Sequence, residues 1–241
     1  MIKRTRLIIV RHAEAEGNAN RLFHGWTDSN ITEKGHFQAT LVAERLKSMD
    51  IDAIYSSTLK RTLQTADYIS KAKNLPIIRT DKLKEINGGD WEDMPWEILP
   101  EKWPEEYDSW ENKPHLHQMP NGESMKEFQT RIVDEFKYII NNNKGKNICI
   151  VTHGTAIKSL MCVFYHCNLE EMVNFPWYDN TSVTIIDHET ENHETDKFTI
   201  VTEGDTSHLS KEMKTLENQE WWLDERLKTG ERKCKDFEYD E

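Results

Sequence analysis

The stretch Leu-Ile-Ile-Val-Arg-His at residues 7–12 decides the fold, and Ile-Cys-Ile-Val-Thr-His-Gly at 148–154 echoes it. A short apolar, β-branched run bounded by polar residues is typical of a buried parallel strand. Each run ends at a histidine, His12 and His153, and about 140 residues separate the two. Ligands bind beyond the carboxyl ends of strands in open α/β sheets, so we expect the histidines to share one pocket. Arg11 precedes the first histidine, which suits that pocket to a phosphate.

Apolar runs alternate with segments of helical periodicity along most of the chain, and this pattern predicts an α/β fold. Strands are expected at 6–10, 53–55, 76–78, 148–151, 182–187 and 198–202. Helices are expected at 32–46, 58–72, 124–140 and 155–165. The stretch 11–32 is rich in small and polar residues, so we expect a loop between the first strand and the first helix.

Residues 86–122 differ in character from the rest of the chain, and we expect an insertion or cap there. Four tryptophans lie among prolines in this stretch, at Trp91, Trp96, Trp103 and Trp110. Most aromatic side chains of a small cap form its own core, although a ligand contact stays open. His115 and His117 are two residues apart with no third ligand in view, so no metal is expected.

The tail from 203 onward is strongly charged and carries apolar residues at spacings of three, four or seven. These residues are Leu209, Met213, Leu216, Leu223 and Leu227. The spacing predicts one amphipathic helix packed on its own domain, so we divide the chain into a domain at 1–205 and a helical tail at 206–241. A dimer contact or a lid remains the alternative for this tail, and the last ten residues are candidates for disorder.

Length and charge restrict the class of protein. The 241 residues fit one large α/β domain, or one domain with an insertion. The formal net charge of −12 argues against nucleic acid and against an acidic membrane surface as partners. A homodimer stays open. Positive charge for binding a phosphate must be concentrated locally in such a chain, so clustered arginines are informative.

Cysteine usage and the N-terminus indicate the compartment. Cys149, Cys162, Cys167 and Cys234 show neither a Cys-x-x-Cys pair nor a metal-ligand spacing, so buried free thiols are expected. The apolar run at 7–10 is too short for a signal peptide or a membrane span. We therefore expect a protein of the reducing cytoplasm.

The Arg-His pair at 11–12 suits phosphoryl transfer. This reaction needs a nucleophile in line with the phosphorus atom and cations around the equatorial oxygens. A neutral imidazole can attack, and a neighbouring arginine favours the neutral ring and grips phosphate through forked hydrogen bonds. Taken alone, the dipeptide is equally compatible with a histidine that merely ends a strand.

The segment Arg-His-Ala-Glu-Ala-Glu-Gly-Asn at 11–18 resembles the signature of the histidine phosphatase superfamily, whose best-known branch is phosphoglycerate mutase. The chain departs at Ala13, where the family more often has glycine; alanine does little harm unless positive φ is required there. Further matches follow in the family's order at 23–28, 31–35, 56–66, 83–92, 120–124 with Arg131, 151–154 and 180–182. The resemblance covers about 200 residues, and it implies a three-layer α/β/α sandwich with a mostly parallel central sheet and a small cap.

The resemblance also implies roles for the matched residues. His12 would attack the phosphate and carry the phosphoryl group, and Glu85 would protonate the leaving alkoxide and later take a proton from water. Glu85 must start protonated, so burial or a nearby anion should raise its pKa. The phosphate oxygens would be surrounded by Arg11, Arg61 and His153, with a hydrogen bond from Asn18.

Further substrate contacts are expected at Arg21, Gly25, Thr152 and Gly154. Of these, Arg21 is better explained as a surface arginine of the loop. Glu14 and Glu16 would repel a phosphate, so we expect them to point away from it or to hold the arginines. Neither a metal nor another cofactor is expected.

Two features resemble the phosphatase branch of the family rather than the mutase branch. Glu85 is followed by Ile-Asn-Gly-Gly-Asp-Trp-Glu, and only about 35 residues separate it from the turn at Pro120. We therefore expect a phosphomonoesterase that acts on a small phosphorylated metabolite. A mutase is the alternative, and a non-catalytic phosphate-binding protein is a third hypothesis that the intact set of matched residues disfavours.

Overall fold

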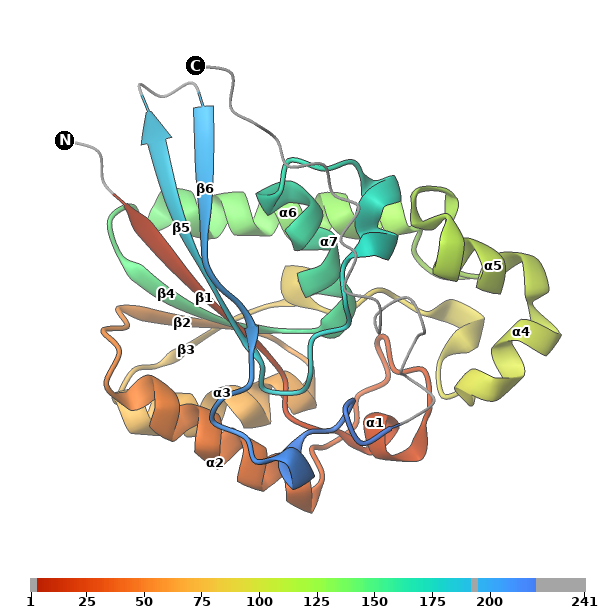
Figure 1. Cartoon of the computed structure of the whole chain (residues 1–241), viewed down its shortest axis with the longest axis horizontal. Helices are drawn as coiled ribbons and strands as arrows, with labels where there is room; N and C mark the ends of the chain where they lie inside the picture. Colours follow the sequence, from red (N-terminus) through yellow and green to blue (C-terminus); the bar gives the residue numbers. More distant parts are fainter. Residues whose placement is uncertain (1–3, 192–194, 220–241) are drawn as a thin grey trace.

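Six strands form the centre of the computed structural model, which describes residues 4–191 and 195–219 (Figure 1). The strands are β1 (Thr5–Arg11), β2 (Ala53–Ser57), β3 (Ile77–Thr80), β4 (Asn147–Thr152), β5 (Val183–Glu191) and β6 (Thr195–Asp205). Their order across the sheet is β3-β2-β4-β1-β5-β6. The pairs among β1 to β4 are parallel, and β5 is antiparallel to both of its neighbours. The expected α/β fold with a mostly parallel sheet is confirmed.

Helices cover both faces of the sheet (Figure 1). On one face lie α2 (Glu33–Lys47) and α3 (Lys60–Lys73), and on the other lie α6 (Met125–Asn142) and α7 (Gly154–Phe164). Alternate residues of β1 supply the two cores: Ile8 and Val10 pack with α2 and α3, whereas Leu7 and Ile9 pack with α6 and α7. All four are fully buried, and each burial contributes about 1.5–3 kcal/mol. The chain thus forms the expected three-layer sandwich.

The helices begin at caps that are visible in the sequence. The Thr32 hydroxyl accepts a hydrogen bond from Gly35 N at 3.0 Å and starts α2. Ser124 and Glu127 form a reciprocal capping box at the start of α6. The expected loop at 11–32 contains one short helix that was not predicted, α1 (Glu16–Asn20).

The expected cap at 86–122 consists of 3-10 turns and two short helices, α4 (Leu99–Lys102) and α5 (Pro104–Asn112). Trp91 is fully buried, and its ring lies 5.6 Å from Phe23, 6.0 Å from Trp110 and 6.3 Å from Tyr107. These aromatic side chains belong to the same buried cluster as Phe128 and Ile132 of α6, so the cap has no separate core of its own. The cap and one face of the sheet therefore share one hydrophobic core.

The segment 206–219 is not the helix that its apolar spacing predicts. It contains turns and a single 3-10 turn at Lys211–Met213. The backbone N–H groups of Thr215 and Leu216 donate to the Asp179 side chain instead of to carbonyls one helical turn back. These long-range bonds replace the helical ones, and Leu209 and Leu216 are buried without a helix. The remainder of the expected helix, 220–241, lies outside the described residues.

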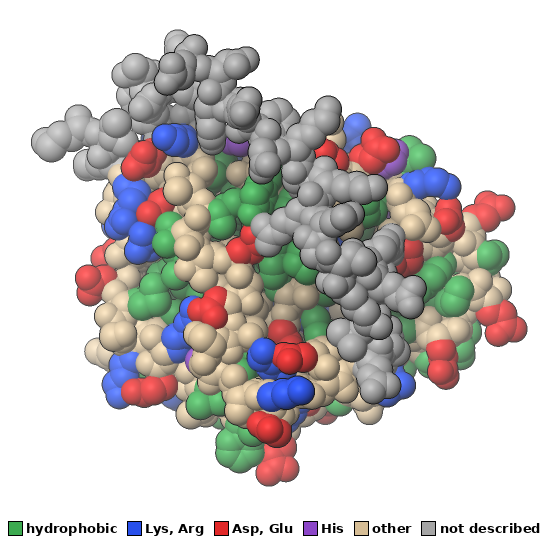
Figure 2. All heavy atoms as spheres, viewed as in Figure 1, with side chains coloured by type: hydrophobic (Ala, Val, Ile, Leu, Met, Phe, Trp, Pro, Cys, Tyr) green, Lys and Arg blue, Asp and Glu red, His purple; other side chains and the backbone are tan. Residues whose placement is uncertain are grey.

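β5 and β6 are longer than the predicted strands, and they pair as the expected antiparallel hairpin. Within residues 4–191 and 195–219, no helix is long and apolar enough to cross a membrane. On the face seen in Figure 2, acidic and basic side chains of the described residues are interspersed rather than gathered by sign.

Candidate active site

The sheet brings the two histidines of the sequence motifs together. His12 follows β1 and His153 follows β4, and these strands are parallel neighbours with Arg11 opposite Thr152. The two imidazole rings lie with their centroids 5.3 Å apart. Both side chains are buried, at 5% and 0% exposure. The site therefore forms at the carboxyl edge of the two central strands, where the topology predicts it.

The hydrogen bonding of His12 determines which ring nitrogen can react. Its Nδ1 lies 2.7 Å from the backbone carbonyl of Ala13. A carbonyl oxygen only accepts, so Nδ1 carries the hydrogen and the lone pair is on Nε2. Burial, and then the charges of Arg61 and Arg11, hold the pKa of His12 well below its ordinary value of 6.5. His12 is thus a neutral imidazole with a lone pair on Nε2 at physiological pH.

Ala13 itself fits the backbone at the position where the family more often has glycine. It is fully buried, its φ is not positive, and its N–H donates to Thr65 Oγ1 at 2.9 Å. Alanine therefore introduces no strain at this position.

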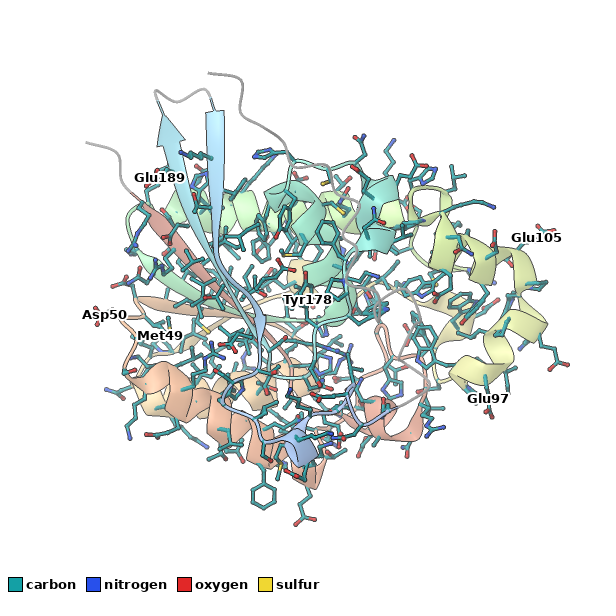
Figure 3. The ribbon with its side chains drawn as sticks, in the orientation of Figure 1. Met49, Asp50, Glu97, Glu105, Tyr178 and Glu189 are labelled. Carbon is teal, nitrogen blue, oxygen red and sulfur yellow. The ribbon has the colours of Figure 1, made fainter. Side chains whose placement is uncertain are left out.

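Arg11 is a buried cation whose Nε has no hydrogen-bond partner among the described residues. One terminal nitrogen donates to the Tyr178 carbonyl at 2.5 Å, and Nε is buried without a hydrogen-bond partner among the described residues. Tyr178 lies near the middle of the molecule (Figure 3). A Cβ atom added at Gly154 would come within 3.4 Å of the guanidinium carbon, so glycine leaves room for the arginine. A buried unpartnered donor of this kind suits an anionic ligand.

Arg61, at the start of α3, is held by the backbone of the loop at 24–27. Its terminal nitrogens donate to the carbonyls of Thr27 at 2.8 Å, Gly25 at 2.7 Å and His24 at 3.3 Å. The guanidinium is 1% exposed, and burial lowers its pKa to about 10. It therefore stays charged at neutral pH and brings a second buried cation to the site.

Glu92 fixes this loop, and sequence reasoning did not single it out. Its carboxylate accepts from the backbone N–H groups of Gly25 at 3.1 Å, Trp26 at 2.6 Å and Thr27 at 2.9 Å. It also accepts from the Thr27 hydroxyl at 2.7 Å and from Gly88 N at 2.9 Å. The sequence does show an acid directly after Trp91, the central aromatic residue of the cap. Only the fold shows which backbone N–H groups donate to its carboxylate.

Glu85 is a buried carboxyl group at the wall of the site, 7% exposed. One oxygen accepts from Ile86 N at 2.9 Å, and the other accepts from Thr155 N at 3.0 Å in the first turn of α7. Burial raises the pKa of Glu85 above its ordinary value of 4.5, and these hydrogen bonds oppose the shift. Burial therefore shifts the pKa of Glu85 in the direction that its expected part in the chemistry requires.

His153 has one partner and one unpartnered nitrogen. Its Nε2 lies 2.9 Å from the Ser57 hydroxyl, and its Nδ1 is buried without a hydrogen-bond partner among the described residues. Among the described residues the Ser57 hydroxyl has no acceptor other than Nε2, so we assign its hydrogen to that contact. Nδ1 then carries a hydrogen and is a donor. Burial, then Arg61, lowers the pKa of His153 well below 6.5, so the ring is neutral.

The remaining expected substrate contacts divide into two groups. Asn18 and Gly154 line the cavity. Gly25 contributes a carbonyl to Arg61, and the Thr152 hydroxyl donates to the Leu83 carbonyl at 3.2 Å. Arg21 is exposed at the end of α1 with a φ of 57°. Among the described residues that line the cavity, Gly25, Thr152 and Arg21 do not appear, so direct contact between these three residues and a substrate stays a prediction.

The two acids of the signature, Glu14 and Glu16, are not among the described residues that line the cavity. The Glu14 carboxylate is buried and accepts from the hydroxyls of Thr32 at 2.8 Å and Thr215 at 3.0 Å, with Lys34 Nζ at 3.2 Å. Glu16 is exposed. Glu14 thus faces the C-terminal segment and does not hold the arginines.

The cavity at the sheet edge has a volume of about 60 Å³ and opens to solvent. Its lining includes the groups described above: Arg11, His12, Arg61 and Glu85. The same lining includes six apolar side chains, namely Leu22, Phe23, Trp96, Trp110, Trp177 and Leu216. Of the cap tryptophans, Trp91 is thus part of the core, whereas Trp96 and Trp110 line the cavity, and their contact with a ligand stays a prediction. Sequence reasoning missed Trp177 and left Leu216 as a residue of the tail helix.

The arrangement joins an imidazole lone pair, two buried guanidinium groups, an unpartnered imidazole donor and a buried carboxyl group. Such a set can hold a tetrahedral dianion, present a nucleophile to it and supply a proton. Among the described residues, no group of three or more His, Cys, Asp or Glu side chains could hold a metal ion. Fold and site together define an α/β protein with a phosphate-binding, phosphoryl-transfer type of pocket.

Comparison with known proteins agrees with this class. The family model of the histidine phosphatase superfamily (branch 1) matches residues 7–201. Phosphoserine phosphatase 1 of Hydrogenobacter thermophilus is 34% identical over 181 residues, 75% of this chain and 85% of that protein. A 2,3-bisphosphoglycerate-dependent phosphoglycerate mutase of Bartonella tribocorum is 30% identical over 175 residues, 70% of this chain and 85% of that protein.

Among solved structures, Bacillus stearothermophilus YhfR has a TM-score of 0.78 to this chain at 35% identity. The match covers 85% of this chain and 98% of that one. The chain belongs to the histidine phosphatase superfamily, a family whose members similar to this chain include phosphatases and mutases.

Proposed function

We propose that this protein hydrolyses phosphomonoesters of a small metabolite through a phosphohistidine on His12. The observation that carries the proposal is the Ala13 carbonyl on Nδ1, which leaves the lone pair on Nε2 of a neutral ring. In the first step Nε2 bonds to phosphorus while the bond from phosphorus to the alcohol oxygen breaks. Protonated Glu85 gives its proton to that oxygen, so the alcohol leaves neutral.

In the second step water replaces the imidazole on phosphorus. Glu85, now ionised, takes a proton from the attacking water, and the nitrogen–phosphorus bond breaks to release inorganic phosphate. Arg11, Arg61 and the Nδ1–H of His153 supply fixed donors to the three non-bridging oxygens in both steps. These donors are held in place before substrate arrives, by Tyr178 O, the loop at 24–27 and Ser57.

Phosphoglycerate mutase activity is the second candidate, because a mutase of Bartonella tribocorum is 30% identical to this chain. A mutase returns the phosphoryl group from histidine to a second oxygen of the substrate and keeps water out. The compact stretch between Glu85 and the turn at Pro120 supports the phosphatase over the mutase, and so does the similarity to a phosphoserine phosphatase.

The test is a screen of phosphate release over a panel of phosphomonoesters, with conversion of 3-phosphoglycerate to 2-phosphoglycerate followed in parallel. Intact-protein mass spectrometry after an alkaline quench detects one added phosphoryl group. We expect phosphate release without isomerisation, and loss of both turnover and the added group in His12→Ala. His36→Ala, an exposed histidine on α2, is the matched control. Turnover retained in His12→Ala rejects the proposal, and fast isomerisation with little phosphate release selects the mutase.

A further inference from the structure

We propose that the apolar part of the cavity lining binds an uncharged, flat apolar group on the alcohol side, so the substrate is the phosphomonoester of an aromatic or similarly flat alcohol. This inference rests on the proposed function and names the substrate class of the same site. We call this part of the lining the leaving-group chamber: Leu22, Phe23, Trp96, Trp110, Trp177 and Leu216. The six side chains come from four separate parts of the chain, which converge on one space.

The walls of the chamber are rings that hold one another in place. Trp110 and Trp177 are stacked, with centroids 6.2 Å apart and an interplanar angle of 22°. Phe23 packs against Trp96 at 5.1 Å and against Trp110 at 5.6 Å. Flat rings fixed in this way present flat apolar surface, and a second flat group gains by packing on it.

The charged side chains among the described residues that line the cavity are those of the phosphate site. Among the lining residues the charged groups are Arg11, Arg61 and Glu85, and all three belong to the phosphate site. His24 also lines the cavity, but its Nε2 already lies 3.0 Å from Asp93, and burial lowers its pKa. A carboxylate on the alcohol side would lose water in the chamber without meeting a new cation there, which is costly.

Lys158 contacts one wall of the chamber, and it does not change this conclusion. Its ammonium lies 4.6 Å from the centroid of the Trp177 ring, while Lys158 is not among the residues that line the cavity.

The fourth contribution, Leu216, comes from the C-terminal segment at 211–219, which follows the last residue matched by the family model. This segment is pinned to the site. Thr215 N and Leu216 N donate to Asp179 at 3.0 Å and 3.1 Å. The Thr215 hydroxyl donates to the buried Glu14 carboxylate at 3.0 Å, two residues after the nucleophile. Leu216 is thus a fixed part of the wall, and the chamber is a property of this chain rather than of the family core.

The test measures binding with phosphonates, which are not hydrolysed. Calorimetry on the full chain compares 2-phenylethylphosphonate, ethylphosphonate and 3-phosphonopropionate, which add a ring, nothing and a carboxylate to one headgroup. Burying the ring removes on the order of 100 Å² of apolar surface from water, so the phenylethyl compound should bind at least about tenfold more tightly than the ethyl compound. The carboxylate compound should bind more weakly than the ethyl compound. Equal or tighter binding of 3-phosphonopropionate than of 2-phenylethylphosphonate overturns the inference.

Variants locate the effect. Leu216→Ala should reduce the phenylethyl-to-ethyl affinity ratio about threefold or more, because it removes part of one wall. Leu216→Arg should raise the affinity for 3-phosphonopropionate relative to ethylphosphonate about tenfold, because it places a cation in the chamber. Leu116→Ala is the control, since this cap leucine is 66% exposed and lies outside the cavity lining. Unchanged ratios in both Leu216 variants refute the chamber assignment.

The two levels of the proposal can fail separately. Binding is measured without turnover, and turnover is measured with 2-phenylethyl phosphate in the wild-type protein and in His12→Ala. The expected binding order without His12-dependent phosphate release rejects the hydrolase and leaves the chamber in place. His12-dependent release together with the reversed binding order rejects the chamber and leaves the hydrolase in place.

Discussion

Glu92 acts on the phosphate site without touching it, and Glu92→Ala should expose that role. The carboxylate accepts five hydrogen bonds, four of them from backbone N–H groups, and three of those belong to the loop at 25–27. The carbonyls of the same loop hold the Arg61 guanidinium. Removing the carboxylate frees the loop, and a freed loop no longer fixes the cation.

The magnitude follows from two parts of this arrangement. Hydrogen bonds to a charged group contribute about 1.5–3 kcal/mol each and are not additive, and solvent reaches this half-buried side chain, so we expect a stability loss of about 2–4 kcal/mol. Losing one fixed donor to a transition-state oxygen costs roughly 10²–10³ in rate. Arg61 is displaced rather than deleted, so kcat/KM should fall about 10- to 100-fold.

The assay combines steady-state kinetics with inhibition by inorganic phosphate, at a temperature well below the unfolding midpoint of the variant. The inhibition constant of phosphate should rise together with the loss in kcat/KM, and Glu92→Gln should recover part of both because it keeps one acceptor oxygen. Glu97→Ala is the control, because Glu97 is exposed on the neighbouring turn and points away from the body of the protein (Figure 3). A variant that melts earlier but keeps its phosphate affinity and its kcat/KM would show that Glu92 only stabilises the fold.

Three further outcomes follow from the site. At low pH the rate should fall as His12 gains a proton, and because the pKa of His12 is held well below 6.5, an acid limb with its midpoint at or above 6.5 contradicts the buried neutral ring. At high pH the rate should fall as Glu85, whose pKa is raised above 4.5, loses the proton that it must donate. Ser57→Ala removes the partner that sets the His153 tautomer and should lower kcat/KM by about tenfold, with wild-type stability in thermal melts distinguishing this from unfolding. EDTA should leave phosphate release unchanged, and a loss that added metal restores would demand a ligand set that the described residues do not form.

The central strands and the residues at their ends could be predicted because their cause is local. The run at 7–12 is apolar and β-branched, and its periodicity places His12 at the strand end whatever happens elsewhere in the chain. A raised pKa of Glu85, from burial or from a nearby anion, was expected because the role implied by the resemblance needs a protonated acid. In contrast, Glu92, Trp177 and Leu216 gain their places from partners far away in sequence, and a single sequence without structure shows no such pairing.

The C-terminal segment 206–219 shows why a helical spacing of apolar residues did not give a helix. Its apolar spacing is helical, yet Asp179 offers acceptors to the N–H groups of Thr215 and Leu216, and bonding to a preformed loop competes with the helix. The periodicity predicts which residues are buried, and it does so correctly for Leu209 and Leu216. It does not decide how the backbone satisfies its own polar groups when another part of the fold can do so.

The place of β1 between β4 and β5 has a consequence for how the chain is made. β1 is synthesised first, but its neighbours in the sheet begin only at Asn147 and Val183. Until those residues leave the ribosome, this largely apolar strand has no partner on either side and presents two open edges. The nascent chain therefore depends on α2 and α3 to cover one face of that strand, and the active site is complete only after β4 and β5 have been synthesised.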